Sequence, residues 1–143
     1  MGYRFLEDVS IADVAFIAKA ADLQSLFKYC SDAVTNTMIK NIKDIKPNVK
    51  KKFHIKAKDI DMLLFRFIEK IIYYKDVYGL VFKDMRSRIK NKGNLYLGEF
   101  EASGEKLDGM KHDLLVDVKA ATFHMLEVKK SGKMWSAMVV LDI

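Results

Sequence analysis

The sequence predicts an α+β fold in which two long helices pack on one face of a mostly antiparallel or mixed β-sheet. Three observations support this prediction. Two segments carry apolar residues at helical spacing, six or seven others alternate like half-buried strands, and most of these strands follow one another through short turns. The 143 residues contain no repeat, low-complexity tract or linker, so we expect one compact domain over residues 1–143.

The N-terminal part of the chain predicts two strands followed by a helix. Residues 3–7 and 12–19 have the composition of strands, and Asp22 is placed to cap the helix that follows. One side of this first helix is apolar and consists of Leu23, Leu26, Phe27, Cys30, Val34 and Met38. Polar residues occupy the other side, so we expect the apolar stripe to face the core.

A strand and a second helix are expected after Pro47, which ends any helical continuation. Residues 49–57 alternate as a strand that presents Phe53 and Ile55, and Asp59 is placed to cap the second helix. The apolar face of this helix is wide and contains Ile60, Leu63, Leu64, Phe67, Ile68, Ile71 and Ile72. A face of this width indicates a helix that is deeply buried or covered by a partner.

A hairpin is expected after the second helix. Residues 80–90 and 95–102 alternate as strands, and Gly93 between them supplies the turn conformation. Residues 104–112 are expected to form a loop and residues 113–117 a short turn.

The last part of the chain predicts a strand over residues 118–128 and a final strand over residues 133–143, joined by a turn at Ser131–Gly132. Because chain ends usually fray, an apolar strand that continues to the last residue indicates that this end is held. Asp142 is unusual in such a strand, and it stands beside the terminal carboxylate of Ile143.

A second carboxylate occupies a similar position near the start of the chain. Asp13 lies within residues 11–18, which otherwise read as a buried strand. If the two strands pair, the carboxylates of Asp13, Asp142 and Ile143 converge. Such oxygen ligands suit a hard cation, Ca²⁺ or Mg²⁺, and leave coordination positions for water or a partner. The alternative is that both aspartates lie in solvent at the edges of their strands.

Bulk properties exclude several classes of protein. The single cysteine, Cys30, excludes an internal disulfide and argues against structural zinc, so we expect a cytoplasmic protein. No apolar run approaches the roughly 20 residues of a membrane span, and residues 1–8 do not resemble a secretory signal. The sequence also lacks the glycine-rich phosphate loops, so we expect no nucleotide to be bound by this chain alone.

The three histidines form no recognisable metal-ligand pair. His54 lies in a basic strand, and His124 lies in an apolar strand whose alternation favours a hydrogen-bonded core histidine over a reactive one. His112, beside Asp113 in a loop, is expected to be more exposed and is a candidate for function. Lys119 has the opposite strand parity to His124, where a buried or partner-facing amine would be unusual.

Basic residues are densest between Lys43 and Lys58, and the formal net charge of the chain is +6. This bias favours acidic partners such as RNA, but it names no ligand. The favoured interpretation of this segment is an ordinary solvated loop and edge strand, and the alternative is a surface that contacts RNA.

Several segments together resemble the archease family, and the resemblance extends over essentially the whole chain. Residues 118–127 (VKAATFHMLE) resemble the family signature Val-Lys-Ala-x-Thr-Tyr-His-x-Met-Glu, and residues 140–143 (VLDI) resemble its ending Ile-Leu-Asp-Ile. Residues 3–7 and 12–16 are similar to its opening strands. Residues 62–82, which end in GLVF, are similar to its long apolar helix and the strand after it.

The sequence also departs from the family pattern. The family has His-Thr before Ala-Asp, whereas this chain has Ser10 and Ile11 after a two-residue expansion that contains Asp8 and Val9. The acidic position itself, Asp13, is retained. Two further positions differ from the family's Arg and Glu, namely Lys111 and Asp117.

Archeases are small accessory proteins that activate the RtcB-type tRNA-splicing RNA ligase by promoting its guanylylation and repeated turnover, and they are not ligases themselves. The resemblance therefore implies a protein cofactor of such a ligase, which reaches tRNA through the ligase complex. It also implies a divalent cation, Ca²⁺ or another such as Mg²⁺ or Mn²⁺, bound through Asp13, Asp142 and Ile143. Candidates for ligase activation or partner contact are His112, Lys119 and His124.

Two other functions are compatible with the residues. A metal-dependent phosphohydrolase or nuclease could use the acidic cluster with Lys119 holding phosphate, although such enzymes usually offer a richer set of ligands. The other is an RNA-binding or chaperone-like partner of tRNA-modifying enzymes, which rests on the lysines between Lys43 and Lys58 and on the family. The aromatic and glycine patterns of common RNA-binding modules are missing from the sequence.

Overall fold

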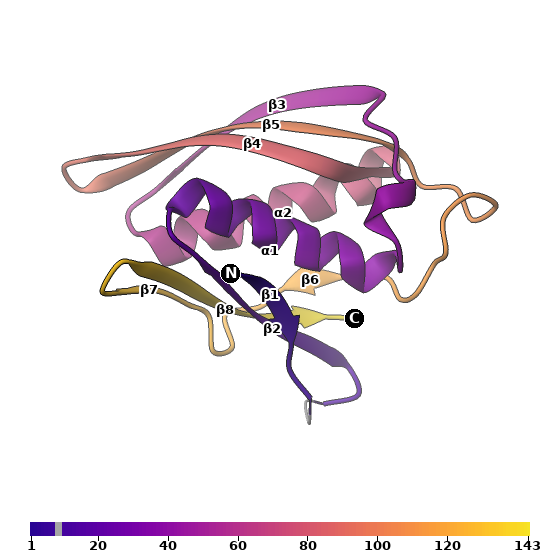
Figure 1. Ribbon diagram of the computed structural model, residues 1–143. Coiled ribbons are helices and arrows are strands. Elements are labelled where there is room, and N and C mark those ends of the chain that lie inside the picture. Colours follow the sequence, from indigo (N-terminus) through magenta and orange to yellow (C-terminus); the bar gives the residue numbers. More distant parts are fainter. Residues whose placement is uncertain (8–9) are drawn as a thin grey trace.

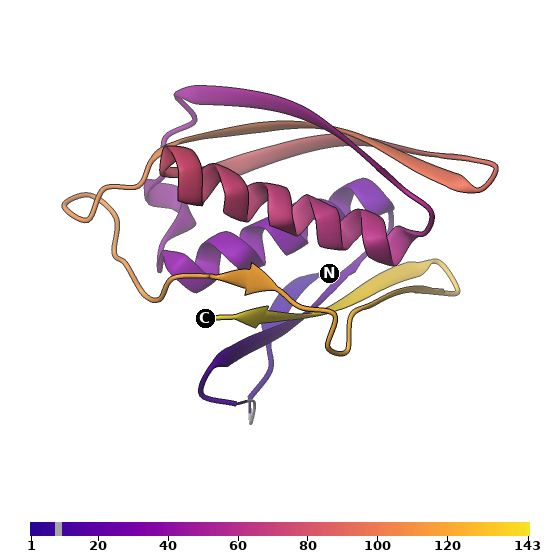
Figure 2. The same ribbon diagram turned by 180° about the vertical axis from the view of Figure 1, so that it is seen from behind.

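Two antiparallel sheets lie on opposite sides of a layer formed by the helices α1 (Leu23–Met38) and α2 (Ile60–Tyr78) (Figures 1 and 2). The computed structural model describes residues 1–7 and 10–143. Within these residues, the five-stranded sheet contains β1 (Gly2–Phe5), β2 (Asp13–Ala20), β6 (Ala120–Ala121), β7 (Glu127–Ser131) and β8 (Met134–Asp142). The three-stranded sheet contains β3 (Val49–Ala57), β4 (Leu80–Lys92) and β5 (Leu95–Lys106). The predicted α+β class and the two long helices are confirmed, and the strands divide between two sheets.

Both helices begin at the residues that the sequence predicts. The carboxylate of Asp22 accepts a hydrogen bond from the backbone N–H of Ser25 at 2.7 Å, and that of Asp59 accepts one from Met62 at 2.9 Å. Such caps satisfy backbone donors that have no partner within the helix, and each contributes about 1 kcal/mol. α2 ends at Gly79, which adopts the left-handed conformation with φ 65°.

The three-stranded sheet has the order β3-β5-β4, and its β4–β5 hairpin is longer than the sequence predicts. β5 continues to Lys106, so Gly104 lies in a strand and not in the predicted loop. A glycine is needed there because a Cβ atom would lie 1.8 Å from the carbonyl oxygen of Val81. The close approach occurs beside a register shift between Phe82 and Asp84 in β4.

The five-stranded sheet is organised around β8. β2 pairs with one edge of β8 over its whole length, while β6 and β7 both pair with the other edge. β1 pairs with the free edge of β2. Asp8 and Val9, the expansion relative to the family pattern, lie outside the described residues.

The core fills the space between the two sheets around a group of aromatic side chains. The ring of Phe100 on β5 lies 4.7 Å from that of Phe67 on α2 and 5.2 Å from that of Phe53 on β3, measured between centroids. Phe27 on α1 completes the group. Cys30 is buried as predicted, and burial raises the pKa of its thiol, so the side chain acts as a small apolar group.

The helices cover only one face of each sheet, which leaves the other face of both sheets directed outward (Figures 1 and 2). The two outward faces differ in composition. Neither α1 nor α2 combines the length and the apolar content needed to cross a lipid bilayer.

Candidate functional site

Asp13 and Asp142 are directly opposite each other in the antiparallel pairing of β2 with β8. Asp13 begins β2 and Asp142 ends β8, so the pairing brings residues from the two ends of the sequence together. Side chains of directly opposed residues leave the same face of a sheet, with Cβ atoms about 4.5–5.5 Å apart. Both aspartates are half-buried.

The backbone around this pair is fixed on both strands. The N–H of Ile143 donates to the carbonyl oxygen of Ala12 at 2.9 Å, which continues the pairing one step beyond Asp142. On the other strand, the N–H of Asp13 donates to the carbonyl oxygen of Ser10 at 3.1 Å and closes a turn. The oxygens of Ile143 therefore belong to the same edge of the sheet as the two aspartates.

A third segment borders Asp142 from the opposite side. Ala120 in β6 is the pairing partner of Asp142 on that side, and the N–H of Lys119 donates to the carbonyl oxygen of Asp142 at 2.8 Å. The side chain of Lys119 is exposed. Asp142 is thus flanked by Asp13 on one strand and by the Lys119 segment on the other.

Lys75 on α2 anchors the segment that carries Lys119. Its ammonium group donates to the carbonyl oxygen of Val118 at 2.8 Å and lies 2.6 Å from a carboxylate oxygen of Asp117 and 2.5 Å from one of Asp76. Burial by itself lowers the pKa of Lys75, but the hydrogen bonds to both carboxylates outweigh it and raise the pKa overall. Lys75 therefore stays charged and holds this segment against the helix.

Sequence reasoning missed Lys75, although a signal was present. The residue falls three and four positions after Ile72 and Ile71, on the apolar stripe of α2. A lysine at such a position is buried only when it has partners.

The two aspartates form a pair and not a larger cluster of side chains. In residues 1–7 and 10–143, no three His, Cys, Asp or Glu side chains converge in a way that could hold a metal ion. A cation at Asp13 and Asp142 would need further oxygens from Ile143, from backbone carbonyl groups or from water. Two opposed carboxylates with no cation between them repel, which makes the pair suited to a hard cation with several open positions.

The expected core position of His124 is wrong, because the predicted strand over residues 118–128 is interrupted. β6 ends opposite Leu141, and β7 begins opposite Met138. The two residues of β8 between these points, 139 and 140, therefore face the five residues 122–126. The excess residues form a turn, in which Met125 adopts the left-handed conformation with φ 55°. His124 lies in this turn and is exposed.

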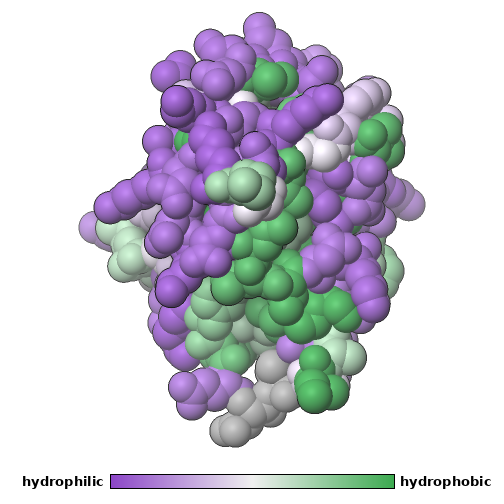
Figure 3. Space-filling view, turned by 90° about the vertical axis from the view of Figure 1, so that its right-hand side faces the viewer, coloured by the Kyte–Doolittle hydropathy of each residue, from purple (hydrophilic) through white to green (hydrophobic). Residues whose placement is uncertain are grey.

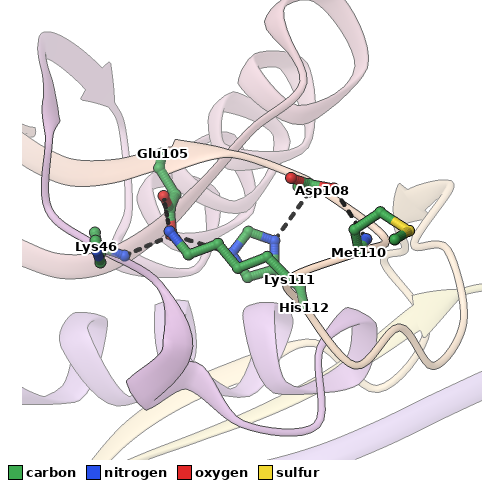
Figure 4. Close-up of polar contacts among 6 residues, drawn as sticks. All are labelled: Lys46, Glu105, Asp108, Met110, Lys111 and His112. Carbon is green, nitrogen blue, oxygen red and sulfur yellow. Dashed lines mark hydrogen bonds and ion pairs between the residues drawn. The ribbon is translucent and has the colours of Figure 1, made fainter.

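His112 is buried, whereas the sequence suggested an exposed histidine. Its Nδ1 accepts a hydrogen bond from the N–H of Asp108 at 3.0 Å, so the ring proton is on Nε2, which lies 3.0 Å from a carboxylate oxygen of Glu105 (Figure 4). Glu105 also accepts hydrogen bonds from the side chain of Lys111 at 2.6 Å and from the N–H of Lys46 at 2.7 Å. Led by the bond from Lys111, these partners lower the pKa of Glu105 to about 2. His112 thus stabilises the loop after β5 and is not available to a partner.

Exposed apolar side chains gather near the end of β8. The space-filling view of this side of the molecule shows a band of apolar residues bordered by polar ones (Figure 3). The loop after β5 lies on this side (Figure 1), and its residues Leu114, Leu115 and Val116 are exposed. Exposed apolar patches of this kind often mark interaction sites.

The outward face of the five-stranded sheet is hollowed. Asp13 shares strand parity with Ile17 and Lys19, so it belongs to the same face. Ile17 and Lys19 line a hollow of about 630 Å³, together with Met138 on β8 and Met125 in the turn before β7. The carboxylate pair therefore lies on the same face of the sheet as this hollow, which is partly apolar.

Comparison with known proteins identifies the family. The model of the archease protein family matches residues 3–143. The chain belongs to the archease family. Among curated relatives, the archease of Pyrococcus furiosus is 31% identical over 134 residues, which cover 92% of this chain and 93% of the relative. The archease of Sulfurisphaera tokodaii is 32% identical over 132 residues, with 92% and 93% coverage.

Solved archease structures share the fold. The solution structure of Methanobacterium thermoautotrophicum protein 1598 superposes with a TM-score of 0.84 at 25% identity and covers 99% of both chains. A crystal structure from Thermotoga maritima, described as an archease and possible chaperone, has a TM-score of 0.55 at 17% identity and covers 98% of both chains. The arrangement of two helices between two sheets is therefore a property that this chain shares with members of the family.

Proposed function

We propose that this member of the archease family activates an RtcB-type tRNA-splicing RNA ligase, promoting guanylylation of the ligase and its repeated turnover, and that it is not a ligase itself. The observation that carries the proposal is the direct opposition of Asp13 and Asp142. Because the resemblance to archeases implies ligase activation, the pair is the site at which we expect this chain to act on the chemistry of its partner.

The carboxylates of Asp13 and Asp142, with an oxygen of Ile143, would hold a divalent cation such as Ca²⁺, Mg²⁺ or Mn²⁺. When bound, a hard cation supplies positive charge that stabilises charge developing on phosphate oxygens during nucleotidyl transfer. The chain's own contribution is to fix the backbone from which these oxygens project, because both strands are paired through backbone hydrogen bonds at this end of the sheet. The incomplete set of protein ligands leaves coordination positions for groups of the partner.

Lys119 would contribute a second point of contact. Its side chain is exposed, while its backbone is fixed by hydrogen bonding to Asp142 and by the anchoring of Val118 on Lys75. An exposed ammonium group on a segment whose backbone is held beside Asp142 suits the recognition of phosphate or of an acidic residue on the ligase. The exposed apolar residues Leu114 to Val116 would supply nearby surface for docking.

Ligase guanylylation in the absence of RNA tests the proposal. Purified ligase is incubated with labelled GTP and limiting amounts of wild-type protein, Asp13→Ala or Asp142→Ala, and labelled ligase is counted over time. Asp44→Ala is the matched control, because Asp44 is an exposed aspartate outside the site. We expect both site variants to lose most of the stimulation and the control to retain it. Equal stimulation by wild type and both site variants would refute the role of the carboxylate pair.

A second assay separates activation from hydrolysis. The purified chain alone is incubated with divalent cation and with RNA or GTP, and the products are resolved by chromatography. An activator leaves both substrates intact. Cleavage of either substrate that is lost in Asp142→Ala would instead identify a metal-dependent hydrolase.

A further inference from the structure

The outward face of the three-stranded sheet is basic along both of its edges. Alternate residues of each strand point outward, and the pairing of β3, β5 and β4 aligns them in rows. One row consists of Lys52, Glu101 and Arg86, and the next consists of His54, Glu99 and Arg88. The cations of this face are Lys50, Lys52, Lys56, Arg86, Arg88, Lys90 and Lys92.

These seven cations exceed the three carboxylates on the same face, Asp84, Glu99 and Glu101. The excess of four positive charges is most of the chain's net charge of +6. All seven cationic residues are exposed. The acidic residues on β5 neutralise them only weakly, because the ion pairs span 3.8 Å from Glu101 to both Lys50 and Lys52, and 3.9 Å from Glu99 to Arg88.

The positive charge is divided between the two edge strands. β3 and β4 carry the cations, and the shorter acidic side chains of β5 lie between them, so the face has two basic rims. A hollow of about 460 Å³ lies along this face and is lined by residues of all three strands, including His54, Arg88 and Glu99. Only part of the basic surface comes from the lysine-rich segment between Lys43 and Lys58. The β4 arginines, Arg86 and Arg88, were not part of that sequence-based prediction.

We propose that this face binds the phosphate backbone of structured RNA. Guanidinium and ammonium groups recognise phosphate oxygens, and an array of them neutralises several phosphates together. The composition of the face favours RNA over an acidic protein, because the core of a protein interface needs apolar or aromatic side chains. Among the described residues of these three strands, the apolar residues with outward parity are Leu97 and Leu95, which lie toward the hairpin end of the sheet.

The same composition defines how RNA would be bound. Modules that read single-stranded bases place aromatic side chains on the sheet surface, where bases stack. The outward rows of β3, β5 and β4 contain no Phe, Tyr or Trp among the described residues, since Phe53, Tyr96 and Phe100 have the inward parity. Binding is therefore directed to the backbone, independent of base sequence and strongly dependent on salt.

This face is separate from the carboxylate pair. Asp13 and Asp142 belong to the five-stranded sheet, and the two helices lie between the sheets (Figure 1). RNA on the three-stranded sheet therefore leaves the carboxylate pair accessible. The inference does not depend on ligase activation, and either could hold without the other.

Fluorescence anisotropy with a labelled RNA hairpin of about 20 base pairs tests the inference on the full chain without ligase. The test variant is Arg86→Gln/Arg88→Gln, and the matched control is Lys40→Gln/Lys133→Gln, which removes the same charge from exposed positions elsewhere. At 100 mM salt we expect the test variant to bind about tenfold more weakly. We also expect the slope of log K against log salt to fall in magnitude by about 2, while the control changes little.

Three results would overturn the inference. One is equal weakening of the test and control variants, which would indicate attraction to net charge alone. Another is the absence of RNA binding at 50 mM salt. The third is binding to poly-glutamate that is as strong as binding to RNA and equally sensitive to the test variant, which would indicate an acidic protein partner. Thermal unfolding of both variants establishes that a loss of binding does not reflect loss of the fold.

Discussion

The ammonium group of Lys75 on α2 lies 2.6 Å from the carboxylate of Asp117, two residues before Lys119. This contact joins the helix layer to the segment that flanks Asp142, because the N–H of Lys119 donates to the carbonyl oxygen of Asp142. The geometry of the carboxylate site therefore depends on Lys75, although Lys75 contacts neither Asp13 nor Asp142 in the interactions described above.

Replacing Lys75 by methionine tests this dependence. The Lys75 side chain is 6% exposed, so methionine fills its volume but leaves the carbonyl group of Val118 without its donor. We expect the free energy of unfolding to fall by about 1.5–3 kcal/mol, measured by urea denaturation. We also expect faster hydrogen exchange at the amide of Lys119. Lys133→Met, at an exposed turn, is the control and should alter neither quantity; an unchanged exchange rate at Lys119 in the Lys75 variant would contradict the anchoring role.

Neutralising one carboxylate of the opposed pair should have opposite effects with and without a cation. In EDTA, Asp13→Asn removes the repulsion between directly opposed like charges and should stabilise the protein by a few tenths of a kcal/mol to about 1 kcal/mol. In millimolar Ca²⁺, the wild type should gain thermal stability through binding and the variant should not. Differential scanning fluorimetry measures both effects, with Asp44→Asn as the control. A calcium-dependent shift that persists undiminished in the Asp13 variant would place the cation elsewhere.

Glu105 should make the protein sensitive to acid. Its pKa in the folded protein is about 2, below the usual 4.5, so it binds fewer protons in the folded state than in the unfolded state. The resulting stabilisation is present above about pH 4.5 and is lost as the pH falls toward 2. Urea midpoints at pH 7, 4 and 3 should therefore decline more steeply for the wild type than for Glu105→Gln. Parallel pH profiles for the two proteins would show that this carboxylate is not the cause.

Two glycine replacements should differ in cost for a geometric reason. An alanine Cβ at Gly104 would lie 1.8 Å from the carbonyl oxygen of Val81, and this backbone cannot move without disturbing the β4–β5 pairing. Gly79 has φ 65° but open space around its Cβ position. We expect Gly104→Ala to cost about 3 kcal/mol or more and Gly79→Ala about 1–2 kcal/mol. Urea denaturation measures both, and equal costs would contradict the close approach of β4 and β5.

Local signals in the sequence predicted the helices and one strand well. Asp22 and Asp59 are short acceptors directly before apolar stripes, and the structure starts both helices after them. β3 covers residues 49–57 as predicted, because its alternation is regular and Pro47 separates it from the preceding helical segment. Each of these features is decided by residues within a few positions of one another.

Features that depend on pairing between distant segments were harder to predict. Alternation along one strand does not reveal its partners, so the division of the strands between two sheets was not visible. The turn that exposes His124 follows from a mismatch in length between residues 122–126 and the facing part of β8. His112 is buried because Glu105, seven residues away, and the N–H of Asp108 satisfy both ring nitrogens. Strand character at Asp13 and Asp142 suggested their proximity, but their register required the structure.

The position of β8 has a consequence for how the protein is made. β8 follows every other strand in the sequence, yet it lies inside its sheet, between β2 on one side and β6 and β7 on the other. During synthesis, the earlier strands of this sheet exist before the strand that joins them. Until β8 is synthesised, the earlier strands present free edges with which strands of other nascent polypeptides can pair. Translation that stalls before residue 134 should therefore yield an aggregation-prone product.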